Sequence, residues 1–276
     1  MELSWIQSIG YGFLSGLTDI LPVSAQAHKV LLLKFFGAQV DANLLDLLIR
    51  LGTMGALYVC SQAQLVRMRR ARALARIPKK RRNRPLDTRS LMDWSLLKTM
   101  LLPVIASFFL LRYVEKLDQN MILVALFLFL NGLILYIPQL FPTGNRDSRT
   151  LSRVEGLLMG LGGAVSVLPG ISSVGAAASV GSVCGVDRVY ALNMALMMHF
   201  VVSAGHAVYD VIGMSGTGGL SFALLVQYLI TAAFAFCGTF LGVRLMRRLA
   251  QGKSFVLFAF YCWGLALFTF ILNLVA

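Results

Sequence analysis

Residues 16–24 read GLTDILPVS, and residues 163–172 read GAVSVLPGIS. A glycine, a leucine and a proline recur in the two stretches at the same relative positions, and in each the proline interrupts an apolar segment and is followed by small polar residues. Interrupted apolar segments at matching places in two halves of a chain are typical of membrane proteins whose site lies at the bilayer midplane. We therefore expect a single membrane domain made of two related halves, residues 1–141 and 154–276.

The composition is that of an integral membrane protein. Of the 276 residues, 58% are hydrophobic and only 13% are charged, and the mean hydropathy is +0.76. A soluble domain carries about a quarter charged residues. A helix needs roughly 20 apolar residues to cross a bilayer. Segments of about this length occur at 43–62, 92–112, 121–141, 189–213, 220–243 and 254–275.

The distribution of basic residues predicts the topology. The segment 63–90 holds eleven Lys and Arg residues against one acid, Asp87. By the positive-inside rule this loop is cytoplasmic, as are the basic loops 142–153 and 244–253. Counting spans from these loops, the interrupted segment 155–185 begins and ends inside, and 5–37 begins and ends outside. The sequence thus predicts an all-α integral membrane protein with six transmembrane helices and two re-entrant helical hairpins in an inverted-topology repeat.

The net charge of +13 is concentrated in the 63–90 loop, which argues against a nucleic-acid partner. Fixing the topology is the simplest role for this loop, and it can also contact anionic lipid headgroups. The four cysteines lie in or beside apolar segments and make no metal-ligand spacing, which favours small buried residues. The N-terminus has no basic region and no cleavage site, so we expect no removable signal peptide.

The tips of the two hairpins are the predicted site. Non-helical backbone at membrane depth is tolerated only where protein or a watery cavity surrounds it, so the tips should meet around a polar pocket. The first tip carries Asp19, Ser24, Gln26 and His28. Asp19 and His28 could form an acid and base pair, since ionisable residues at this depth are functional candidates. The alternative is that Asp19 or Ser24 caps a helix.

The second tip carries Gly170, Ser172, Ser173 and Gly175. Successive backbone N–H groups and hydroxyls at the start of a helix can bind an anion such as phosphate. The alternative is that these small residues only let helices pack closely.

Two helices that follow the tips carry isolated polar residues. Arg50 has apolar neighbours on both sides and would bind phosphate as a planar fork, or else pair with Asp46 on the same helix face. For His199 a hydrogen-bonded packing role is the better hypothesis, and His206 and Asp210 are expected to form a pair near the outer end of their helix.

The segment from Gly16 to His28 resembles the signature of the undecaprenyl-diphosphate phosphatase, or bacitracin-resistance, family. Residues 169–175 resemble the second signature of that family, and the similarity extends to 49–53 and 258–261, so it covers essentially the whole chain. The resemblance implies an enzyme of the bacterial inner membrane, multi-pass, that removes the terminal phosphate of undecaprenyl diphosphate. It also implies the inverted repeat, and we expect the pocket to open to the outer face.

The chain departs from the family pattern at several positions. The first of two motif acids is replaced by Ser15, leaving Asp19, and the second of two motif hydroxyls is replaced by Ala25. The phosphate-binding arginine of the second motif is replaced by Ser173, and an arginine expected after Tyr261 is replaced by Cys262. Arg50 stands where the family more often has Gln or His, and its guanidinium could supply the positive charge that the missing motif arginine no longer provides.

By this resemblance we expect Asp19, His28 and Ser24 to be catalytic. The expected phosphate-binding residues are Ser172, Ser173, Gly170, Gly175, Arg50, Gln26 and Ser15. A divalent cation, Mg²⁺ or Ca²⁺, would have Asp19 as its only carboxylate at the first tip, which is a poor site. Because of these departures, loss of catalysis remains an alternative. The chain would then transport a polyprenyl phosphate between leaflets or serve as a lipid-binding scaffold; a homodimer stays open.

Overall fold

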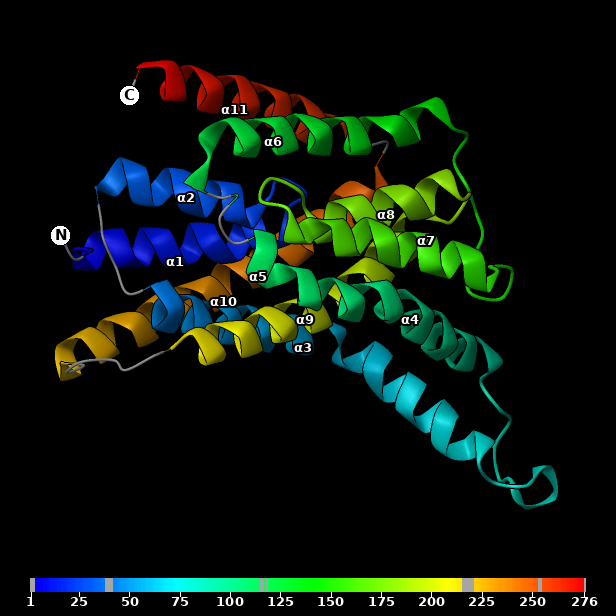
Figure 1. Cartoon of the computed structure of the whole chain (residues 1–276). Helices are drawn as coiled ribbons and strands as arrows, with labels where there is room; N and C mark the ends of the chain where they lie inside the picture. The colour runs from blue at the N-terminus through cyan, green and yellow to red at the C-terminus, as the bar shows by residue number, and fades with distance from the viewer. Residues whose placement is uncertain are drawn as a thin grey trace.

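The structure is a computed structural model that describes residues 3–37, 42–114, 117, 119–214, 221–252 and 255–275. Within these ranges the chain is helical, and the long helices lie side by side along one common direction (Figure 1). The α-helices are α1 (Trp5–Ile20), α2 (Ala25–Phe36), α3 (Ala42–Ala75), α4 (Thr88–Ser107), α5 (Leu111–Val114), α6 (Met121–Tyr136), α7 (Arg153–Ala164), α8 (Ser173–Val183), α9 (Arg188–Gly213), α10 (Phe222–Gln251) and α11 (Val256–Val275). Short 3₁₀ turns are η1 (Lys79–Arg81), η2 (Phe108–Leu110), η4 (Ile137–Leu140) and η5 (Val165–Val167).

The six predicted spans are confirmed as helices long and apolar enough to cross a membrane. They cover Asn43–Ala75, Thr88–Val114, Met121–Leu140, Arg188–Gly213, Phe222–Gln251 and Val256–Leu274. Large apolar side chains such as Leu102, Phe109 and Leu267 are exposed on their outer faces. Outward-facing apolar side chains are what a lipid environment requires, because the bilayer core offers no water.

Two pairs of shorter helices surround the proline motifs. The pair α1 and α2 is joined by the turn at Pro22, and the pair α7 and α8 is joined by the turn at Pro169. In Figure 1 the α1–α2 pair lies on the left and the α7–α8 pair on the right, and their connecting turns point toward each other near the centre. Each half of the chain therefore has one helix pair followed by three longer helical segments.

The sequence analysis expected a loop over the whole basic segment 63–90, but the first part of this segment is helical. Helix α3 continues to Ala75 and projects beyond its neighbours (Figure 1). One face of this extension is packed against the rest of the protein. Met68 and Ala71 on it are buried, and beside them the guanidinium of Arg72 lies 5.1 Å from the ring centre of Trp94. Likewise α10 continues to Gln251, through most of the predicted loop 244–253. The arginines that predicted a loop by their charge are also good helix formers, and one face of the helix that they extend is packed.

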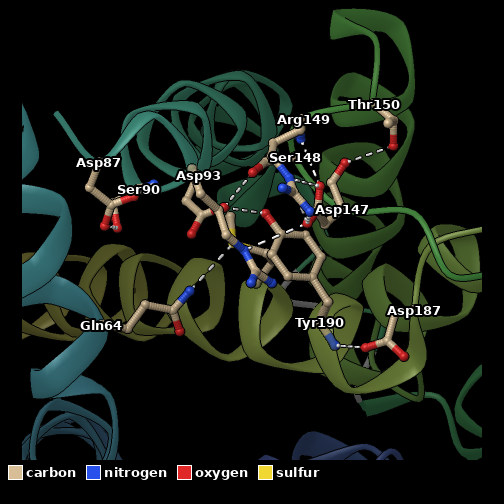
Figure 2. A network of polar contacts seen from close by, with 12 residues as sticks. Gln64, Asp87, Ser90, Asp93, Asp147, Ser148, Arg149, Thr150, Asp187 and Tyr190 are labelled. Atoms are coloured by element: carbon tan, nitrogen blue, oxygen red, sulfur yellow. Dashed lines mark hydrogen bonds and ion pairs between the residues drawn. The ribbon is translucent and has the colours of Figure 1, made fainter. Parts of the chain in front are cut away.

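A network of polar contacts holds the segment between η4 and α7 against α4 and α9 (Figure 2). The buried carboxylate of Asp93 accepts hydrogen bonds from the hydroxyls of Ser148 and Tyr190. Nearby, Arg149 and Arg89 pair with Asp147, and the hydrogen bonds from Arg149 hold the pKa of that carboxyl below its usual value. These contacts fix the connection between the two halves of the chain.

Close contact between the halves depends on glycine. A Cβ atom added at Gly16 of α1 would lie 2.0 Å from the carbonyl oxygen of Ala235 in α10, and one added at Gly238 would lie 2.2 Å from the carbonyl oxygen of Phe13. Small residues at such positions let helix backbones approach, which is how membrane helices associate.

We therefore predict that Gly16→Ala lowers the free energy of unfolding by about 1–3 kcal/mol, because the added methyl group must push two backbones apart. The control is Gly10→Ala on the same helix, where an added Cβ has nothing within 4 Å. That change should leave stability equal or slightly higher, since alanine favours helix over glycine. Thermal unfolding in detergent measures both; equal midpoints for the two variants would contradict the packing account.

Candidate functional site

The two proline turns touch each other, as predicted. The hydroxyl of Ser172 donates to the carbonyl oxygen of Leu21 at 3.4 Å, and Gly175 packs so closely on Pro22 that a Cβ there would lie 2.6 Å from its side chain. The buried amide of Asn131 on α6 joins the turns: its Nδ2 donates to the Pro22 carbonyl at 2.9 Å, and its Oδ1 accepts from the Ser172 N–H at 3.0 Å. This side chain thus pairs a backbone group of each turn, and the Cys262 thiol makes a longer contact, 3.7 Å, with the same Pro22 carbonyl.

A cavity of about 270 Å³ lies beside the contact between the turns. Both turns contribute to its wall, together with α2, α3, α5 and α9. The lining residues include Asp19, Ala25, Gln26, Lys29, Asn43, Asp46, Arg50, Gln119, Ser166, Pro169, Ser172, Ser173, His199, Ser203, His206 and Asp210. A smaller adjoining cavity shares Asp19, Lys29, Asp46 and Arg50 with it and is also lined by Ser15. The predicted polar pocket between the tips is therefore present.

Asp19 contacts His199, not His28. Its Oδ2 lies 3.0 Å from Nε2 of His199, and the other ring nitrogen, Nδ1, lies 2.6 Å from the hydroxyl oxygen of Ser173. Ser203 lies 3.3 Å from Nε2. These residues come from α1, α8 and α9, and the side chain of His199 is buried. His199 is buried and hydrogen-bonded, as the packing hypothesis expected, but its ring also lines the cavity and bridges two candidate site residues.

His28 lies away from this cluster. Its Nδ1 donates to the carbonyl oxygen of Ser24 at 2.8 Å, and its Nε2 accepts from the hydroxyl of Tyr261 at 2.7 Å. The two rings are stacked, with centres 5.7 Å apart. The predicted Asp19–His28 pair is therefore not what the structure contains, because α2 turns His28 toward α11.

Ser24 is a helix cap. Its buried hydroxyl accepts from the N–H of Ala27 at the start of α2, and it is not among the residues that line the cavity. Its φ of 66° lies in the left-handed region, a conformation that costs a non-glycine residue on the order of 1–3 kcal/mol. This geometry matches the capping alternative, and it corrects the assignment of Ser24 as a catalytic hydroxyl.

Two ion pairs lie in the wall of the cavity. Nε of Arg50 donates to Oδ2 of Asp210 at 2.7 Å, and the ammonium group of Lys29 pairs with Asp46. Arg50 thus faces the cavity, and its partner comes from α9 rather than from Asp46 on its own helix. The expected His206–Asp210 pair is replaced by this contact, and Nδ1 of His206 donates to the Val202 carbonyl oxygen.

Some of the remaining predicted residues line a cavity, and the others shape the second turn. Ser172 and Gln26 line the main cavity, and Ser15 lines the smaller one. The hydroxyl of Ser172 also caps α8 by accepting from the N–H of Gly175. Gly170 has a φ of 127°, and it packs on the backbone of α6 at Phe127 and Leu128. Gly170 and Gly175 therefore shape the second turn, as the close-packing alternative predicts.

The carboxylates of the cavity do not fit a divalent metal site. Asp46 is paired with Lys29, Asp210 with Arg50, and Asp19 with His199. Within the described ranges, no group of three His, Cys, Asp or Glu side chains converges to hold an ion. Mg²⁺ and Ca²⁺ require several oxygen ligands around one point. We therefore derive no chemical step through a protein-bound metal.

Asn131 and the partner of Arg50 were missed by the sequence analysis. Asn131 is the one amide in the otherwise apolar helix MILVALFLFLNGLILY, residues 121–136, and a lone polar residue in such a helix is a signal worth following. His199 carries the same signal within its methionine-rich surroundings. Neither signal says which distant residue is the partner.

Spanning helices around a polar cavity, with two interrupted helix pairs that meet beside it, define a multi-pass membrane protein with an internal polar site. The family described as bacitracin resistance protein BacA matches residues 8–268. The chain belongs to that family, as the motifs at 16–28 and 169–175 indicated.

Several relatives align along nearly their whole length. A protein of Methanobrevibacter smithii named undecaprenyl-diphosphatase is 28% identical over 271 residues, which is 96% of either chain. One of Desulforapulum autotrophicum with the same name is 27% identical and covers 100% of both chains. The undecaprenyl-diphosphatase 1 of Shouchella clausii is 23% identical over 98% of this chain and 96% of its own.

We predict that Asn131→Ala destabilises the contact between the turns. It leaves the Ser172 N–H without its partner, at about 1–3 kcal/mol for an unsatisfied buried group, and leaves the Pro22 carbonyl only the 3.7 Å contact with the Cys262 thiol. Thr99→Val is the control, because the Thr99 hydroxyl bonds only to the carbonyl of Ser95 within its own exposed helix turn. Thermal unfolding in detergent should show a clear loss for the first variant alone; a loss no larger than that of the control would contradict the role of Asn131.

Proposed function

We propose that this chain hydrolyses the terminal phosphate of undecaprenyl diphosphate, and releases the monophosphate lipid carrier of cell-wall synthesis. Family membership and the names of full-length relatives support this activity over transport or a scaffold role. The observation that carries the proposal is the cavity between the two motifs. In its wall a hydroxyl, an imidazole and a carboxylate contact one another, and two cationic side chains line the same cavity.

In our proposal α1–α2 and α7–α8 are re-entrant hairpins of an inverted repeat, with halves at 1–141 and 154–276. Their helices of 11 to 16 residues are short for a span, and their turns approach from opposite sides (Figure 1). A helix of about 20 residues is needed to span a typical bilayer.

We further propose that the cavity opens to the outer face of the bacterial inner membrane. The basic end of α3 is cytoplasmic by the positive-inside rule, so the opposite end, at Asn43, lies outside. The cavity is lined near that end by Asn43 at the start of α3, Gln119 just before α6, and Asp210 near the end of α9. A diphosphate headgroup would enter there while the prenyl chain stays in the lipid. The basic extension of α3 would contact anionic headgroups at the inner face.

The direct test is phosphate release from undecaprenyl diphosphate by the purified protein, with and without Mg²⁺ or Ca²⁺. We expect release by the wild type. Asp19→Ala should lower the rate about a hundredfold or more, because it removes the partner that orients His199. The control is Asp187→Ala at the start of α9, outside the cavity, which should keep the rate. Failure of the wild type to release phosphate from this lipid would overturn the proposed function.

Arg50 is expected to bind the phosphate of the lipid. Arg50→Gln should weaken binding of undecaprenyl monophosphate by about tenfold to a hundredfold, since a hydrogen bond to a charged group contributes about 1.5–3 kcal/mol. Because this variant leaves Asp210 unpaired, the matched form is Arg50→Gln with Asp210→Asn. The exposed Arg153→Gln, at the start of α7, is the charge control. Binding in nanodiscs measures the effect, and unchanged affinity in the matched double variant would refute this role.

A further inference from the structure

Three side chains in the cavity are arranged in series. The hydroxyl oxygen of Ser173 lies 2.6 Å from Nδ1 of His199, and Nε2 of the same ring lies 3.0 Å from Oδ2 of Asp19. Ser173 is the first residue of α8, His199 lies in the middle of α9, and Asp19 lies at the end of α1. A hydroxyl, a base and a residue that orients the base, each within hydrogen-bond reach of the next, is the arrangement that activates a nucleophile.

The partners of His199 determine where its proton lies. The carboxylate of Asp19 can only accept, so Nε2 carries the proton. The lone pair of Nδ1 then faces Ser173, whose hydroxyl donates to it. Ser203 lies on the protonated nitrogen, 3.3 Å away, so it receives no activation from this ring. Ser173 is the hydroxyl placed to lose its proton to His199.

The hydroxyls of Ser24 and Ser172 do not contact His199 and instead cap helices. Each accepts a backbone N–H as a helix cap, and Ser172 also donates to the Leu21 carbonyl. Ser173 lines the cavity, at the N-terminus of the 11-residue helix α8. Helix N-termini favour bound phosphate, so phosphate oxygens beside Ser173 would face the positive end of α8.

We propose that Ser173 is the nucleophile in a two-step hydrolysis, with His199 as its general base and Asp19 as the residue that positions His199. The inference rests on the proposed phosphatase function and names the residues that perform it. The motif arginine is thus replaced by a reactive serine, and the cationic role passes to Arg50, across the same cavity.

In the first step the Oγ–P bond to the terminal phosphorus forms while the bond from that phosphorus to the bridging oxygen breaks. The proton of Ser173 moves to Nδ1 of His199 and then to the departing monophosphate lipid. In the second step water attacks the phosphoserine, and His199 takes one water proton and returns it to Oγ. Inorganic phosphate leaves and Ser173 is regenerated, so that the sum is one diphosphate and one water giving two monophosphates.

The first experiment uses the full chain in detergent with undecaprenyl diphosphate labelled at the terminal phosphorus. Acid quenching followed by peptide mapping should find phosphoserine at Ser173. Ser173→Ala should abolish the label and lower phosphate release by about a thousandfold or more. The control is Ser182→Ala, a buried serine of the same helix whose hydroxyl bonds to the Ala178 carbonyl, away from the cavity. Release undiminished in Ser173→Ala, or a phosphoserine at another position, would overturn the proposal.

The second experiment separates this inference from the choice of substrate. Diisopropyl fluorophosphate transfers its phosphoryl group to an activated serine and loses fluoride, without any prenyl lipid. The wild type should be labelled at Ser173. His199→Ala should lose the label, with partial recovery on adding imidazole, and Asp19→Asn should slow labelling while circular dichroism stays native. Labelling at Ser173 without release from undecaprenyl diphosphate would support the triad and refute the proposed function. Absence of both labelling and release would refute the two together.

Discussion

The contact between the two proline turns, held by the buried amide of Asn131, is the interaction on which the site depends. Each turn carries backbone groups that no helix can satisfy, and membrane lipid offers them no partner. Asn131 accepts from one turn and donates to the other, so the turns stabilise each other only when they meet. The positive φ of Ser24 shows that the first turn adopts a costly conformation there, which these contacts must offset.

Charge in the cavity is arranged in pairs that join different helices. Lys29 with Asp46, and Arg50 with Asp210, link α2 to α3 and α3 to α9, and His199 links α8 to α1. Removing charges from water is costly unless each has a partner, so these pairs make a polar cavity compatible with the surrounding apolar core. An entering phosphate would compete with Asp210 for Arg50. If Arg50 binds phosphate as proposed, binding of the anion would be coupled to the packing of α3 against α9.

The architecture could be predicted from the sequence because hydropathy, charge and the recurring proline motif are properties of continuous segments. These features gave the six spans, the paired interruptions and the meeting of the turns. The extent of α3 and α10 was not predicted, because arginines that mark a loop by charge are also good helix formers.

Of the predicted site residues, Asp19, Ser172, Ser173 and Arg50 all line the cavity. Ser24 and His28, which lie in the same motif as Asp19, do not line it. The direction of a side chain depends on helix orientation after the turn, and α2 directs His28 to Tyr261. The partners Asp19–His199 and Arg50–Asp210 are 180 and 160 residues apart in the chain, and a single sequence gives no signal for such pairs.

The central claim is that one water-filled cavity is enclosed by both turns. Thiol accessibility tests it directly, in a form of the chain whose four native cysteines are replaced. Ala25→Cys and Val167→Cys place a thiol on the cavity wall from the first and second turn, and Leu102→Cys places one on the exposed apolar surface. In sealed vesicles, a charged, membrane-impermeant thiosulfonate should modify the first two from the outer side only and leave the third unmodified. Modification of Ala25→Cys and Val167→Cys from opposite sides, or of neither, would contradict the account.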